Sequence, residues 1–187
     1  IADTLIVGRY LGANALAAVG AAYALMSFLT SILLGLCMGS GAVFSLRYGE
    51  KNEKVLKKSI FVSFVMIAAV ALAVNGVVFL FIDPIMGLLC VPAEIYSMMR
   101  EYLWMIFWGI IAVFLYNFFA SLLRSVGNSF VPLLFLGIAA VLNVVLDLVF
   151  VLVLHWGVAG AAGATVIAQY VSGIGIAVYT YVKMPEF

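Results

Sequence analysis

Charged residues are scarce in this chain. Asp, Glu, Lys and Arg make up 9% of its 187 residues, whereas 67% are hydrophobic. An ordinary soluble domain has about 25% charged and about 45–50% apolar residues, and a chain of this length buries only about 70% of its extended surface when it folds in water. The surplus apolar side chains must therefore face lipid, which predicts an integral membrane protein.

Excess positive charge, cysteine and histidine are also lacking. Nine basic against eight acidic residues give a net charge of +1, too little to neutralise nucleic-acid phosphates. Cys37, Cys90 and the single His155 supply neither a disulfide framework nor a tetrahedral zinc site. Because no P-loop, GxSxG elbow or metal-spaced His pair occurs, we expect no enzyme activity. An intramembrane aspartyl protease needs two aspartates, which Asp3 and Asp147 supply, but no further motif supports that alternative.

Long apolar runs predict membrane-spanning helices, because about 20 such residues cross a hydrocarbon core of about 30 Å. The predicted fold is an all-α membrane protein, a six-helix bundle with its first helix truncated. Residues just before 18, with Gly12, Asn14 and several alanines, are predicted to form a loop or interfacial stretch. Both chain ends fall in apolar stretches, so we expect a piece of a longer protein, and the part seen has no signal peptide. The predicted spans are 1–8 (truncated), 18–46, 59–82, 101–123, 130–154 and 159–182.

The basic residues predict an orientation, since cytoplasmic loops are enriched in Lys and Arg. If the segment 47–58 is cytoplasmic, alternation of the spans places seven basic residues inside and leaves only Arg9 and Arg100 outside. The inside set is Arg47, Lys51, Lys54, Lys57, Lys58, Arg124 and Lys183. We therefore expect the Arg47–Lys58 loop to be cytoplasmic.

Two aspartates lie inside predicted spans, where a charge is expensive. Asp3, Asp147 and the hydroxyl of Thr165 fall at similar depths, roughly 8–11 Å below the outer edge of the core. Asn143 precedes Asp147 by four residues, so both project from one helix face. Two carboxylates in a low-dielectric cavity cannot both stay charged cheaply. Such a site takes up a proton or a hard cation such as Na⁺, which prefers several oxygen ligands.

Structural roles remain open for the same residues. Either aspartate can pair with a basic group of another chain, although no Lys or Arg lies within the spans seen here. Asn117 and Thr165 can simply bond a neighbouring helix or their own backbone. His155, beside Trp156, fits an interfacial anchor better than a proton relay.

Five segments resemble, in order and spacing, the landmarks of the multidrug and toxic compound extrusion (MATE) transporters. The resemblance implies twelve spans in two six-helix lobes, with this chain as the amino-terminal lobe and the carboxy-terminal lobe as its missing partner. The segments are ADTLIVGRYLGANALAAVG (Ala2–Gly20), GLCMGSGAVFSLRYGEKN (Gly35–Asn52), LLRSVGNSFVP (Leu122–Pro132), LNVVLDLVF (Leu142–Phe150) and GVAGAAGATVIAQ (Gly157–Gln169).

The resemblance also implies a site. Asp3 matches the family's first-helix aspartate, and Asn143 with Asp147 matches the Asn-x-x-x-Asp of its DinF-like kind; the NorM-like kind has Asn where this chain has Asp147. By the same resemblance Thr165 and Asn117 complete the cation or proton site, and Tyr102 lines the cavity. We assign ion coupling, including a candidate Na⁺ site, to Asp3, Asn143, Asp147 and Thr165, and the substrate cavity to Asn117 and Tyr102.

The expected function is an antiporter in a bacterial or archaeal cytoplasmic membrane. It exports amphipathic, often cationic compounds by alternating access, is driven by H⁺ or Na⁺, and has membrane lipid and small organic molecules as partners and no other cofactor. A flippase for lipids or lipid-linked precursors is the alternative; such proteins hold a pyrophosphate with several cavity arginines, and the spans of this half have none. A scaffold or channel subunit has no need for depth-matched aspartates.

Overall fold

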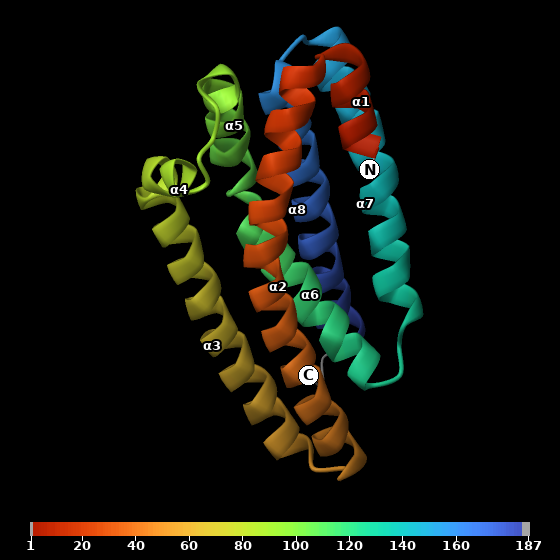
Figure 1. Cartoon of the computed structure of the whole chain (residues 1–187). Coiled ribbons are helices and arrows are strands. Elements are labelled where there is room, and N and C mark those ends of the chain that lie inside the picture. The colour runs from red at the N-terminus through yellow and green to blue at the C-terminus, as the bar shows by residue number, and fades with distance from the viewer. Residues whose placement is uncertain (1, 185–187) are drawn as a thin grey trace.

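The computed structural model describes residues 2–184, and within that range every regular element is a helix (Figure 1). Residue 1 of the predicted truncated span, and residues 185–187, lie outside the described part. The all-helical structure of residues 2–184 confirms the predicted all-α fold class. The elements are α1 (Ala2–Tyr10), α2 (Ala13–Gly49), α3 (Glu53–Leu80), α4 (Ile82–Leu88), α5 (Ala93–Ile106), α6 (Gly109–Ser125), α7 (Phe130–Leu148), the π-helix η1 (Val149–Val153) and α8 (Gly157–Lys183).

These elements form a membrane bundle. Helices α2, α3 and α8, and α7 together with η1, are each long and apolar enough to cross a membrane. Helices α5 and α6 pass the same test as a pair, bent by 44° at a short break. Together with the short α1, these five spans make the six-helix bundle. Helix α4 lies within the connection between α3 and α5.

Helix α2 begins earlier than the sequence predicts. Residues 13–17, predicted as a loop or interfacial stretch, form its first turns. The alanines there have the highest helix propensity of any residue, and this outweighs Asn14. The turn falls instead on Gly12, whose φ of 93° favours glycine.

Helices α6 and α8 occupy the middle of the bundle. Helix α8 packs against α5, α6 and α7, and α2 packs against α3, α5 and α6. A cluster of phenylalanines, including Phe64, Phe114 and Phe118, joins α3 to α6 with ring centroids 5.2–6.0 Å apart. Helix α1 lies against α2, α7 and α8 (Figure 1). The first aspartate is thereby brought beside the helices that carry the second aspartate and the threonine.

Gly173 of α8 lies directly against the backbone of α6. A Cβ added there would stand 2.9 Å from the backbone oxygen of Ala112 and 3.3 Å from Cβ of Leu115. Because the backbone cannot move aside without separating the helices, Gly173→Ala should destabilise the fold by about 1–3 kcal/mol. Thermal unfolding of the full-length protein in detergent measures this. Gly39→Ala on α2, where no atom lies within 4 Å, is the control and should leave the melting temperature unchanged or slightly higher.

An exposed polar cluster ties α4 to α5. Arg100 donates from Nε to Oδ1 of Asp83 at 2.8 Å, and the Tyr96 hydroxyl donates to the same oxygen at 2.9 Å. The hydrogen bond from Arg100, followed by that from Tyr96, holds the pKa of Asp83 below its ordinary value of 3.8.

This lowered pKa predicts how Asp83 affects stability. A carboxyl whose pKa falls on folding stabilises the fold above its unfolded pKa, and loses that contribution as the pH drops through the folded value. Asp83→Asn should therefore lower the melting temperature slightly at pH 7, because the cluster is exposed. The difference from wild type should shrink as the pH falls below about 4. A difference that persists at low pH would contradict an ionic origin.

Candidate functional site

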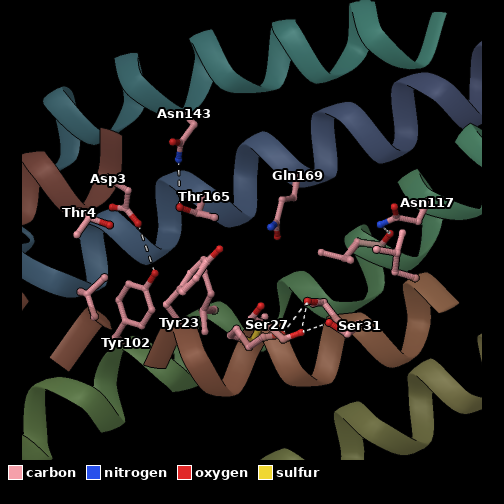
Figure 2. A pocket seen from close by; sticks show the side chains of 16 residues that line it. Asp3, Thr4, Tyr23, Ser27, Ser31, Tyr102, Asn117, Asn143, Thr165 and Gln169 are labelled. Atoms are coloured by element: carbon pink, nitrogen blue, oxygen red, sulfur yellow. Dashed lines mark hydrogen bonds between the residues drawn. The ribbon is translucent and has the colours of Figure 1, made fainter. Parts of the chain in front are cut away.

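A cavity of about 450 Å³ opens among six helices of the bundle. Its walls come from α1, α2, α5, α6, α7 and α8, and Figure 2 shows their side chains converging on it. Five of the six residues assigned from the sequence line it: Asp3, Tyr102, Asn117, Asn143 and Thr165. The fold thus gathers these five side chains into one cavity, although Asp3 and Thr165 are 162 positions apart in the chain.

Asp3 and Tyr102 meet on one wall of the cavity. The Tyr102 hydroxyl donates to Oδ2 of Asp3 at 3.4 Å, and this long hydrogen bond joins α1 to α5. Within the described residues the other oxygen, Oδ1, is buried and has no hydrogen-bond partner. Half of this carboxylate is therefore free to bind a proton or a cation.

Asn143 and Thr165 join α7 to α8. The Asn143 side-chain nitrogen donates to Oγ1 of Thr165 at 3.1 Å, and the Thr165 hydroxyl donates to the backbone oxygen of Ala161 at 3.2 Å. Thr165 therefore bonds both a neighbouring helix and its own backbone, which are the two bonds expected if its role is only structural. The amide oxygen of Asn143 and the hydroxyl oxygen of Thr165 can still accept hydrogen bonds or bind a cation on the side of the cavity that Asp3 also lines (Figure 2).

Asp147 is the one assigned residue that does not line the cavity. It lies one turn after Asn143 on α7, its side chain is fully buried, and within residues 2–184 neither carboxylate oxygen has a hydrogen-bond partner. A bare carboxylate in such a place requires a proton or a cation.

The chain changes its winding just beyond Asp147. The π-helix η1 follows α7 directly, and Leu154 donates to the backbone oxygen of Val149, five residues back, at 3.0 Å. π-Helical turns are rare and often occur at functional sites. Nothing in the sequence pattern of this apolar segment signals the π-helix.

Asn117 lies at the far end of the cavity from Asp3 (Figure 2). Its side-chain nitrogen donates to the backbone oxygen of Val113, one turn earlier on α6, at 2.8 Å. A hydrogen bond to its own helix backbone is what we expect of Asn117 if its role is only structural. The amide thus faces the cavity while remaining tied to its own helix.

The sequence reasoning missed several polar residues of the cavity. Tyr23, Ser27 and Ser31 repeat every four residues along α2 and line one wall, and Gln169 lines the opposite wall from α8. The spacing of the α2 residues was the available signal, because polar side chains four apart in an apolar helix share one face. Gln169 follows Thr165 by four residues on α8, so it could have been predicted to share the cavity face with Thr165.

The described residues contain no group of three or more His, Cys, Asp or Glu side chains placed to hold a metal ion. A cation in this cavity would instead be held by a mixed set of carboxylate, amide and hydroxyl oxygens. Hard cations such as Na⁺ prefer oxygen ligands of this kind. The same carboxylates can equally take up protons.

Comparison with known proteins gives relatives over the whole chain. A family model described as MatE matches residues 1–149. The "Probable multidrug resistance protein YpnP" of Bacillus subtilis (strain 168) is 32% identical, over 89% of this chain and 38% of the relative. The "Probable multidrug resistance protein NorM" of Thermotoga maritima is 28% identical, over 100% of this chain and 41% of the relative.

Solved structures share this fold. A crystal structure of MATE in the bent conformation superposes with a TM-score of 0.92 at 25% identity, covering 97% of this chain and 40% of that one. An inward-facing multidrug resistance MATE family transporter of the MOP superfamily superposes equally well, over 98% of this chain and 41% of that one. The chain spans about two fifths of the length of these relatives, as one lobe of such a transporter does.

Proposed function

This chain belongs to the MatE family, and from that premise we propose that it is the amino-terminal lobe of an antiporter that exports amphipathic, often cationic compounds. Inward movement of H⁺ or Na⁺ drives the export, and the lobe holds the coupling ion. The family assignment rests on a model matching residues 1–149. Two of the relatives are described as probable multidrug resistance proteins, which supports organic compounds as the exported class.

One observation carries the proposal: two carboxylates, on α1 and α7, lie inside the bundle with three buried oxygens unpartnered in the described structure, one of Asp3 and both of Asp147. Buried polar groups in proteins are nearly always hydrogen-bonded. A scaffold protein has no use for carboxylate oxygens that lack a partner. A transporter that alternately binds and releases an ion needs these oxygens to be without a protein partner in one of its states.

We assign the roles as follows. Asp3 and Asp147 bind the coupling ion, and the oxygens of Asn143 and Thr165 complete its shell. Tyr102 and Asn117 line the adjoining part of the cavity, where the exported compound binds. Ion and compound are coupled because each binds the inward-open and outward-open states with unequal affinity.

The placement in the membrane follows from the same proposal. The six spans are α1, α2, α3, the bent pair α5 and α6, α7 with η1, and α8. The segment 47–58, which comprises the end of α2, the turn after it and the start of α3, carries five of the nine basic residues and lies in the cytoplasm of a bacterial or archaeal cell.

Efflux of ethidium from proteoliposomes that contain the full-length protein tests this function. We expect efflux under a pH gradient or under a Na⁺ gradient, and the effective gradient identifies the coupling ion. Efflux that responds to neither gradient would contradict the antiporter and favour the flippase alternative.

A further inference from the structure

Residues of α8 brace the break between α5 and α6. The two helices bend by 44° around Phe107 and Trp108, which belong to neither helix. A helix end leaves backbone groups that need outside partners. The Tyr170 hydroxyl supplies one by donating to the backbone oxygen of Trp108 at 2.7 Å.

The neighbouring residue, Gln169, presses into the same break. A Cβ added to Gly109, the first residue of α6, would collide with Oε1 of Gln169. Only glycine permits so close an approach. Among the described residues Oε1 finds no hydrogen-bond partner there and is buried. An amide oxygen in that position has lost its water without gaining a donor, which is unfavourable.

Gln169 also belongs to the cavity. It follows Thr165 by one helical turn on the same face of α8, and its side chain points into the space between Thr165 and Asn117 (Figure 2). One side chain therefore contacts both the cavity and the break. Helix α5, on the other side of the break, carries Tyr102, which bonds Asp3.

We propose that Gln169 selects exported compounds that carry an N–H donor and transmits their binding to the break. The inference rests on the proposed function and deepens it. A compound with an amine or anilinium N–H draws the orphan oxygen away from Gly109 and into the cavity. The vacated break lets α5 pivot, which displaces Tyr102 from Asp3 and links compound binding to the ion site.

Two probes separate this role from a merely structural one. Ethidium is an aromatic organic cation that carries two amino groups, whereas tetraphenylphosphonium is an aromatic organic cation with no N–H. In the full-length protein, Gln169→Leu keeps the bulk and removes the amide. The KM for ethidium should rise about tenfold, because one hydrogen bond to a charged partner is lost. The KM for tetraphenylphosphonium should stay at the wild-type value, because this cation has no N–H to donate.

The outcomes are distinguishable. If wild type exports both cations and Gln169→Leu changes neither KM, or changes both equally, the selection by Gln169 is wrong while the proposed function stands. If wild type exports neither cation, the proposed function fails and this inference fails with it.

The contact with Gly109 has a test of its own. Gly109→Ala forces the amide out of the break and into the cavity, where tetraphenylphosphonium offers it no N–H, so the KM for that cation should rise. Adding Gln169→Ala to that variant removes the colliding oxygen and should restore the KM. Gly137→Ala on α7, where no atom lies within 4 Å, is the matched control and should behave as wild type. A Gly109→Ala defect that Gln169→Ala leaves unrestored would overturn the coupling.

Discussion

Asp147→Asn in the full-length protein is expected to abolish gradient-driven export while leaving the protein folded. The amide occupies the same volume as the carboxylate but cannot carry the coupling proton or neutralise a sodium ion. The Asp147 carboxylate has no hydrogen-bond partner among residues 2–184, so replacing it breaks no bond within the described lobe. The melting temperature should accordingly be preserved or raised, since an uncompensated buried carboxylate is itself destabilising.

The control for this variant is Asp83→Asn, which removes a carboxylate that lies outside the cavity and is exposed. It should retain export near the wild-type rate. Efflux of ethidium under the effective gradient measures both variants. Export by Asp147→Asn at the wild-type rate would make Asp147 a structural residue and remove it from the coupling site.

Asn143→Leu is expected to have the second largest effect, on the affinity for the coupling ion. It removes the hydrogen bond at 3.1 Å that joins α7 to α8, and it removes an amide oxygen from the cavity that Asp3 also lines. Loss of one interaction with a charged partner is worth about 1.5–3 kcal/mol, so the ion concentration for half-maximal export should rise about tenfold or more.

Asn75→Leu is the matched control for Asn143→Leu. Asn75 is an amide on α3 whose buried side-chain oxygen has no hydrogen-bond partner among the described residues, as in Asp3 and Asp147, but it does not line the cavity. Its replacement should leave the ion dependence unchanged. Equal shifts in the two variants would show that the effect comes from disturbed packing rather than from ion binding.

The sequence predicted the fold class from its apolar runs, and it suggested the cavity residues from their depth in the spans and from the resemblance to the MATE transporters. The apolar runs gave the all-α class, and five assigned residues line one cavity. Matching depth along neighbouring spans was enough to place Asp3 near Thr165. Their roles in coupling stay predictions, because the positions of the residues do not reveal what they bind.

Other features depend on tertiary contacts and escaped prediction. The break at Phe107 and Trp108 falls within the predicted span 101–123, and it is stabilised by Tyr170 from a helix 62 residues away in sequence. Full burial of Asp147 outside the cavity, and the π-helix that follows it, likewise arise from how α1, α7 and α8 pack together. A pattern read along a single helix carries no information about such packing.

Displacement of the coupling ion by the exported compound tests the central claim most directly. Ethidium is added to the purified full-length protein in weakly buffered detergent solution, and released protons, or released radioactive sodium, are measured. The account predicts that wild type releases the ion and that the Asp3→Asn, Asp147→Asn double variant releases none while still binding ethidium. Equal release from wild type and the double variant would contradict the account, because the ion would then be held by residues other than these two aspartates.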